Sequence, residues 1–146
     1  MCLKLKDITM EANTNMGVVA GIVVKDNRVL LLFHSKLCKW TLPMGKVEEG
    51  ELPLNAISRE LYEELDINLI NSKVLIEKEY IFSDIKTRDV TVFDITSYDG
   101  KLVNKEPDKH RSIIWLSFNE ICCMKKYQML DILAEDVLIR NLINIT

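Results

Sequence analysis

Carboxylates cluster in one short segment of the chain, and clustered carboxylates are the groups that bind hard divalent cations. Glu60, Glu63 and Glu64 stand at positions i, i+3 and i+4, so on a helix they share one face, within about 100° of arc. The neighbouring arc of this helix is apolar: Ile57, Leu61 and Leu65. Side by side, such carboxylates repel by roughly a few tenths of a kcal/mol per pair, which Arg59 or a bound cation would relieve. From the glutamates alone, a solvated acidic helix face is the alternative.

The helix that would carry these glutamates spans Pro53–Asp66, because proline suits a first helical turn and the apolar positions that follow recur at helical spacing. Upstream, residues 16–25 and 28–34 are apolar runs joined by Asp26-Asn27, which predicts a β-hairpin. The other expected elements are an extended piece at 41–43, strands at 73–82, at 88–98 and ending at Trp115, a helix opened by the capping box Ser117–Glu120, and an amphipathic helix over residues 127–146.

Composition and the order of these elements predict a single α/β domain over residues 1–146. The chain is 48% hydrophobic and 28% charged, which is ordinary for a globular domain. Strands outnumber helices and do not alternate with them regularly, which predicts a mixed β-sheet sandwiched between α-helices. The net charge of −3 argues against broad binding to nucleic acid or anionic membranes, although a divalent cation would still admit an anionic substrate. With no membrane-length apolar run, no signal-peptide pattern and no CxxC pair, a cytoplasmic protein with reduced thiols is expected.

The stretch from Gly45 to Ile67, GKVEEGELPLNAISRELYEELDI, resembles the Nudix box, G-x5-E-x7-R-E-U-x-E-E-x-G-U, in which U is a bulky aliphatic residue. The matching positions are Gly45, Glu51, Arg59, Glu60, Leu61, Glu63, Glu64 and Ile67. Asp66 stands where the family has its second glycine, at a helix end that favours φ > 0, a conformation that aspartate tolerates better than most residues. The preceding WTLPMG is similar to the family's W-x-L-P-G-G. The resemblance implies the Nudix fold.

In the Nudix family the box forms a loop–helix–loop that holds Mg²⁺ or Mn²⁺, and the resemblance therefore implies a role for each matching residue. The metal ligands would be Glu60, Glu63, Glu64 and the backbone carbonyl of Met44. Arg59 would orient the glutamates by ion pairing. Glu51 would hold a metal-bound water or cap the helix. Either Glu60 or Glu51 would take the proton of the attacking water.

Outside the box, the segment KEPDK resembles the acidic loop that offers one more carboxylate to the metals in MutT-type hydrolases. Glu106 is the first candidate for that carboxylate and Asp108 the second, and a solvated charged turn is the alternative. His34 and His110 have no partner at metal-ligand spacing, so neither receives a role.

Candidate substrate contacts flank the box. Lys39 and Lys46 could bind phosphates, although surface lysines are commonly only solvated. The aromatic residues that could stack on a nucleobase, or pack in the core instead, are Phe33, Trp40, Tyr80, Phe82 and Phe93. Of these, Phe33 and Trp40 are taken as the site candidates.

The resemblance implies an enzyme, a Nudix pyrophosphohydrolase that requires Mg²⁺ or Mn²⁺. The short chain, the WTLP approach and the EPDK loop favour a nucleoside triphosphate as substrate, cleaved to a nucleoside monophosphate and pyrophosphate. Dinucleoside polyphosphates, nucleotide sugars and capped RNA ends are alternative substrates, and a module that binds a nucleotide without turnover is the alternative class. The expected partner is a small nucleotide, with no stable nucleic-acid complex and no membrane. The sequence leaves a homodimer open.

Overall fold

Seven strands form one mixed sheet in the computed structural model, which describes residues 17–82 and 84–141. The strands are β1 (Val18–Lys25), β2 (Arg28–His34), β3 (Lys39–Thr41), β4 (Met44–Lys46), β5 (Asn68–Ile81), β6 (Thr87–Asp99) and β7 (His110–Leu116). β1 runs parallel to β6 and antiparallel to β2 and β4, whereas β5–β6, β2–β3 and β2–β7 are antiparallel pairs. The mixed sheet expected from the order of the elements is confirmed.

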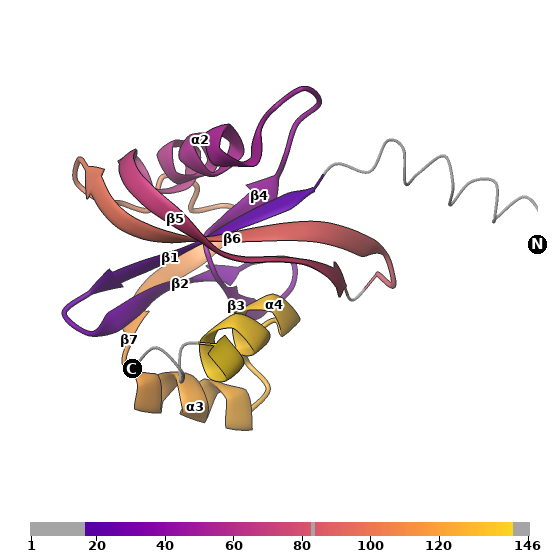
Figure 1. Ribbon diagram of the computed structural model, residues 1–146. Coiled ribbons are helices and arrows are strands. Elements are labelled where there is room, and N and C mark those ends of the chain that lie inside the picture. Colours follow the sequence, from indigo (N-terminus) through magenta and orange to yellow (C-terminus); the bar gives the residue numbers. More distant parts are fainter. Residues whose placement is uncertain (1–16, 83, 142–146) are drawn as a thin grey trace, which may run out of the picture.

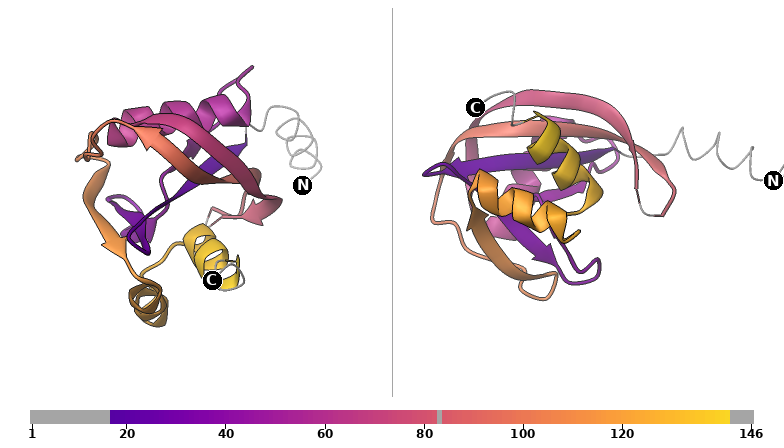
Figure 2. Two further views of the ribbon diagram at one scale, coloured as in Figure 1. Left: turned by 60° about the vertical axis from the view of Figure 1, so that its left-hand side comes forward. Right: turned by 90° about the horizontal axis from the view of Figure 1, so that it is seen from below.

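Helices lie on both sides of the strands (Figures 1 and 2). The helices are α2 (Pro53–Leu65), α3 (Phe118–Lys126), α4 (Ile132–Glu135) and the π-helical turn η1 (Asp136–Asn141) that continues α4. α2 covers one side, and α3 and α4 lie on the other. The predicted α/β architecture, a sheet sandwiched between helices, is therefore confirmed. None of the helices in the described part of the chain is long and apolar enough to cross a membrane.

β1 separates two hydrophobic cores because its side chains alternate between the faces of the sheet. Ala20 and Ile22 face a core shared with the C-terminal helices, whereas Val19 and Val23 face the core under α2. The α2 residues in that second core are Ala56, Ile57, Leu61 and Leu65. Each of the larger side chains contributes roughly 1.5–3 kcal/mol on burial, so packing against β1 fixes the position of the helix and of its glutamates.

The β1–β2 hairpin confirms the prediction made from its apolar runs, with β1 beginning at Val18; Met16 lies outside the described residues. Asp26 and Asn27 connect the strands with φ of 52° and 60°. Positive φ at both central residues is what a two-residue type I′ turn requires, and Asp and Asn tolerate it well. The capping box is also confirmed, since the Ser117 hydroxyl accepts from the Glu120 N–H and the Glu120 carboxylate accepts from the Ser117 N–H.

Three predicted boundaries were wrong. β5 begins at Asn68, five residues before the expected start at Lys73, because its first residues form a largely exposed stretch without apolar alternation. The extended piece expected at 41–43 is instead two short strands, β3 and β4, on either side of Leu42-Pro43.

The third difference concerns the C-terminal helix, which was expected from residue 127 but begins at Ile132. Leu130 forms an isolated β-bridge with Trp40, and this pairing keeps the backbone extended. Asp131 then caps the helix by accepting a hydrogen bond from the Ala134 N–H at 2.7 Å. Leu142 and the residues after it lie outside the described part of the chain.

Candidate active site

Helix α2 turns two glutamates of the box inward and leaves the third at the surface. Glu60 and Glu64, four residues apart, are only 7% and 0% exposed, while the Glu63 side chain is 48% exposed. The inward pair lies next to the apolar arc that packs on β1, so the packing of the helix carries both carboxylates below the surface. Burying carboxylates costs free energy unless hydrogen bonds or opposite charges compensate.

The C-terminal end of α2 has the predicted left-handed cap. Asp66 has φ 60° and ψ 33°, and its N–H donates to the carbonyl of Tyr62 at 3.0 Å. Its carboxylate pairs with the Lys105 ammonium at 3.3 Å. Asp66 therefore replaces the glycine of the box as a helix cap, and its side chain is engaged by a lysine.

Arg59, on α2, binds the carboxylates of three glutamates of the box. Its Nε and Nη2 donate to the two oxygens of Glu51 at 2.9 and 3.0 Å, and its Nη1 donates to Glu60 at 2.9 Å. Nη1 also lies 3.4 Å from Glu63, and Nη2 donates to the backbone carbonyl of Lys46. These hydrogen bonds hold the pKa of Glu51 down to about 2. Arg59 thus ties the loop before α2, the helix and β4 into one unit.

Gly45 lets β4 approach the helix closely. A Cβ at this position would overlap the carboxylate of Glu60. The missing side chain therefore provides the space in which the Glu60 carboxylate sits against the backbone of β4. Burial in this position raises the pKa of Glu60, although Arg59 opposes the shift.

The loop between β6 and β7 brings a second set of groups to α2. The Lys105 N–H donates to the carbonyl of Glu64 at 2.9 Å, which fastens the loop to the last turn of the helix. The N–H groups of Lys109 and His110 both donate to the carbonyl of Glu106, at 3.0 and 2.8 Å. This helical turn orients Glu106, Lys109 and His110 relative to the helix, whereas Asp108 is exposed.

Glu64 lies where the helix and the loop meet. Neither of its oxygens accepts a hydrogen bond within the described residues, although its Oε2 is 3.5 Å from Lys109 Nζ and 3.2 Å from His110 Nε2. Burial raises the pKa of Glu64 to about 8, against the opposing effect of Lys109. Burial likewise lowers the pKa of His110 to about 4, so its imidazole is neutral at pH 7. Among the described residues, Glu64 therefore has one ammonium group nearby but no hydrogen bond to compensate its burial.

A divalent cation fits this group of residues. One ligand atom each from Glu64, Glu106 and His110 lie within 4.8 Å of one another. Two ligands bound to one ion at about 2.0–2.2 Å are at most roughly 4.4 Å apart, so small side-chain movements would bring all three onto one ion. The cation would also add to the counter-charge that the Lys109 ammonium provides near Glu64.

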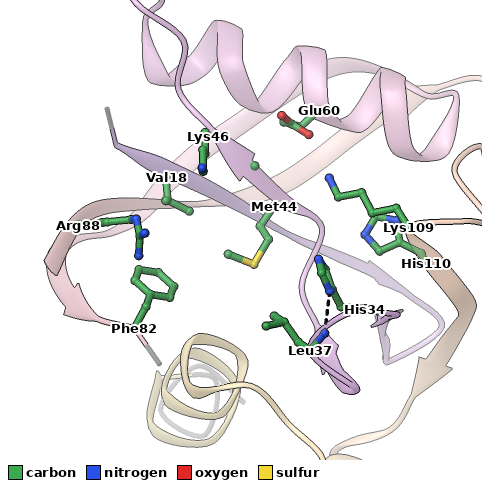
Figure 3. Close-up of a pocket in the computed structure, with 11 residues that line it drawn as sticks. Val18, His34, Leu37, Met44, Lys46, Glu60, Phe82, Arg88, Lys109 and His110 are labelled. Atoms are coloured by element: carbon green, nitrogen blue, oxygen red, sulfur yellow. Dashed lines mark hydrogen bonds between the residues drawn. The ribbon is translucent and has the colours of Figure 1, made fainter. Parts of the chain in front are cut away.

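A cavity of about 420 Å³ opens beside these groups (Figure 3). Glu60, Lys109 and His110 lie at one end of it, and Phe82 and Arg88 lie across from them. The other lining residues are Val18, His34, Leu37, Met44, Gly45 and Lys46. Arg88 is held by Asp84 at 2.6 Å, with its guanidinium 5.1 Å from the centre of the Phe82 ring. The cavity thus combines an apolar wall with three cationic side chains.

The residues predicted for the site divide into two sets. Those that gather around α2, β4 and the loop before β7 are Met44, Lys46, Glu51, Arg59, Glu60, Glu63, Glu64 and Glu106. Phe33, Trp40 and Lys39 do not line the cavity. The rings of Phe33 and Trp40 contact each other edge to face at 5.2 Å, and the Lys39 ammonium donates to the carbonyl of Gln128. Among the other aromatic candidates, Phe82 lines the cavity, and Tyr80 and Phe93 are buried in the cores.

His110 lies beside Glu64, although the sequence assigned it no role. It belongs to the helical turn that begins at Glu106, so the spacing Glu106-x3-His110 is the signal that could have found it. Its contact with Glu64 joins residues 46 positions apart, and no local pattern in the sequence predicts that.

Comparison with known proteins places this architecture in a family. The chain matches the family model described as NUDIX domain over residues 15–136. Putative 8-oxo-dGTP diphosphatase 2 of Mycobacterium tuberculosis is 31% identical over 113 residues, which cover 73% of this chain and 77% of that protein. RNA pyrophosphohydrolase of Francisella tularensis subsp. mediasiatica is 32% identical over 93 residues, which cover 64% of this chain and 52% of that protein.

Solved structures agree with this result. The MutT NUDIX hydrolase from Burkholderia pseudomallei superposes with a TM-score of 0.66 at 27% identity, covering 71% of this chain and 84% of that one. The MutT protein from Methanosarcina mazei Go1 shares the fold with a TM-score of 0.72 at 23% identity, covering 86% and 91% of the two chains. The chain belongs to the Nudix hydrolase family, whose members generally use divalent metals.

Proposed function

We propose that this Nudix hydrolase cleaves a nucleoside triphosphate to a nucleoside monophosphate and pyrophosphate, with Mg²⁺ or Mn²⁺ as its cofactor. The observation that carries the proposal is the fully buried Glu64 carboxylate, which lacks hydrogen-bond donors and lies beside Glu106 and His110. A bound cation would stabilise the anionic form of such a group well beyond what the Lys109 ammonium at 3.5 Å provides. The adjoining cavity supplies the place for a phosphorylated substrate.

The size and lining of the cavity favour a mononucleotide. Its volume of about 420 Å³ lies in the lower part of the range of small-molecule sites, roughly 300–1,000 Å³. Phe82, across the cavity from Glu60, and Met44 offer apolar surface to a nucleobase. Lys46 and Lys109 offer ammonium groups to phosphates. The M. tuberculosis relative, whose name states an 8-oxo-dGTP diphosphatase, supports the same substrate class.

Different residues of the box have different roles in the proposed hydrolysis. Bound Mg²⁺ or Mn²⁺ would neutralise polyphosphate oxygens and lower the pKa of the attacking water. The residues that would hold the cation are Glu60, Glu63, Glu64, Glu106 and the backbone carbonyl of Met44. Arg59 keeps Glu51 and Glu60 in place through its hydrogen bonds. Its role is to position these carboxylates.

Glu60 is the better proton acceptor of the two candidates. The hydrogen bonds from Arg59 keep the pKa of Glu51 at about 2, so Glu51 is a weak base. Burial instead raises the pKa of Glu60, and its carboxylate borders the cavity. Position supports the same choice, because Glu60 lines the cavity whereas both carboxylate oxygens of Glu51 accept hydrogen bonds from Arg59.

A substrate screen tests the proposal. The full chain is incubated with nucleoside triphosphates, 8-oxo-dGTP, dinucleoside polyphosphates, nucleotide sugars and 5′-triphosphorylated RNA, each with Mg²⁺, with Mn²⁺ and with EDTA. Phosphate is read with and without added inorganic pyrophosphatase, which separates pyrophosphate release from phosphate release. A nucleoside triphosphate cleaved to pyrophosphate with either metal supports the proposal. Selective cleavage of RNA ends would instead place the protein with its RNA pyrophosphohydrolase relatives.

A further inference from the structure

His110 is a buried histidine with no role in the hydrolysis proposed above. It begins β7, and its side chain is only 3% exposed. Its Nε2 lies 3.2 Å from Oε2 of Glu64, so the ring is aimed at that carboxylate. Its Nδ1 has no hydrogen-bond partner among the described residues. Buried polar groups in folded proteins are normally satisfied, so the pair lacks a ligand.

A hydrogen bond between His110 and Glu64 would compensate the buried carboxylate less well than a cation bound by both side chains. If Nε2–H donated to Glu64, the second carboxylate oxygen would stay buried without a partner among the described residues. A cation bound by both side chains would compensate the charge of the carboxylate and bind the lone pair of Nε2, with the imidazole proton on Nδ1. Two ligands about 2.1 Å from one ion and at right angles lie about 3 Å apart, which is close to the 3.2 Å observed.

Glu106 reaches the same point from the loop before β7. The His110 N–H donates to the carbonyl of Glu106 at 2.8 Å, so the two residues are one helical turn apart on the same side. Together with Glu64 they offer three ligand atoms within 4.8 Å of one another. The Lys109 ammonium, 3.5 Å from Glu64, is the nearest positive charge and would give way to the cation.

We propose that His110 binds a divalent cation directly through Nε2, together with Glu64 and Glu106, and that this nitrogen makes the centre prefer Mn²⁺ over Mg²⁺. The inference rests on the proposed metal-dependent function for its Glu64 ligand and adds a nitrogen ligand and a metal preference. Mg²⁺ favours oxygen ligands and retains its waters, whereas an imidazole favours first-row transition metals. A single nitrogen ligand therefore shifts the selectivity of an otherwise carboxylate site.

The test measures metal binding and needs no turnover. Mn²⁺ is titrated into the full chain while the signal of the unbound ion is followed by electron paramagnetic resonance, and Mg²⁺ affinity is obtained by competition. Pulsed measurements on the Mn²⁺-loaded protein then detect coupling to an imidazole ¹⁴N. The first variant is His110→Phe, which keeps a flat ring but has no nitrogen to bind a metal. His110→Asn is the second variant. His34→Phe is the matched control, because the His34 Nδ1 is engaged by the Leu37 N–H at 3.2 Å.

The expected result is ¹⁴N coupling in the wild type and in His34→Phe, and its loss in the His110 variants. Mn²⁺ affinity should fall at least about tenfold in those variants, and Mg²⁺ affinity by less than about threefold. The chain has 2 histidines, so coupling in His34→Phe identifies His110 even where the His110 variants do not fold. Mn²⁺ bound without nitrogen coupling would overturn this inference and leave the proposed function standing. No binding of either metal would overturn both.

Discussion

Replacing Glu64 with glutamine should stabilise the metal-free protein at neutral and alkaline pH. The Glu64 side chain is fully buried without a hydrogen-bond donor, and this burial raises its pKa from 4.5 to about 8. An acid whose pKa is higher in the folded state stabilises the fold below its unfolded pKa. That contribution is lost as the pH rises through the folded pKa. Glutamine has nearly the same shape and carries no charge to desolvate.

The size of the effect follows from the two pKa values. Each pKa unit corresponds to about 1.4 kcal/mol. Raising the pH from about 5 to about 8 should therefore cost the wild type about 3 kcal/mol of unfolding free energy through Glu64 alone. Glu64→Gln should lack this loss.

Urea unfolding in EDTA at these two pH values measures the difference. The pH-dependent loss in the wild type, minus the loss in Glu64→Gln, isolates the contribution of Glu64 from that of other groups. Glu79→Gln is the control, because Glu79 is an exposed glutamate on β5. A variant whose stability falls with pH as steeply as that of the wild type would refute the reasoning. Glu64 would then be hydrated or paired in solution.

Three further predictions concern other positions. Gly45→Ala should lower turnover by at least about 100-fold and reduce the melting temperature, because the added methyl overlaps the Glu60 carboxylate; a normal rate would contradict the packing. Asp66→Gly should raise the unfolding free energy by up to about 1 kcal/mol, less what the surface pair with Lys105 contributes, and metal-induced stabilisation in thermal melts should be unchanged. Burial raises the pKa of Asp131 to about 6, so Asp131 should stabilise the fold below pH 4, and this contribution should be lost as the pH rises through 6. In Asp131→Asn, which keeps a capping group, the unfolding free energy should therefore change less with pH across this window.

The part of the fold that the sequence predicts correctly is the part where one local pattern dominates. α2 was predicted within one residue because proline opens it and apolar residues recur along one face. The β1–β2 hairpin was equally clear. The start of β5 was missed because Asn68–Ser72 gain their strand conformation by pairing with β6, with an irregular register and little burial. Propensity alone does not report such pairing.

The candidate site divides in the same way. The spacing of Glu60, Glu63 and Glu64 puts them on one helix, so the sequence predicts that these three carboxylates lie together. Contacts between distant segments decide the rest: His110 meets Glu64 only because the loop before β7 is fastened to the end of α2. Likewise Phe82 borders the cavity, whereas Phe33 and Trp40 pack against each other. An aromatic side chain on a strand can face a core or a cavity, and which of the two it faces depends on the segments that pack against that side of the strand.

The measurement that tests the central claim most directly is a ³¹P nuclear magnetic resonance time course of nucleoside triphosphate hydrolysis with Mn²⁺. The wild type should convert the triphosphate to a nucleoside monophosphate and pyrophosphate, without a nucleoside diphosphate. EDTA should stop the reaction, and Glu64→Gln should slow it by orders of magnitude while remaining folded. Turnover that persists in EDTA, or that is unchanged in Glu64→Gln, would contradict a cation held by Glu64 as the basis of catalysis.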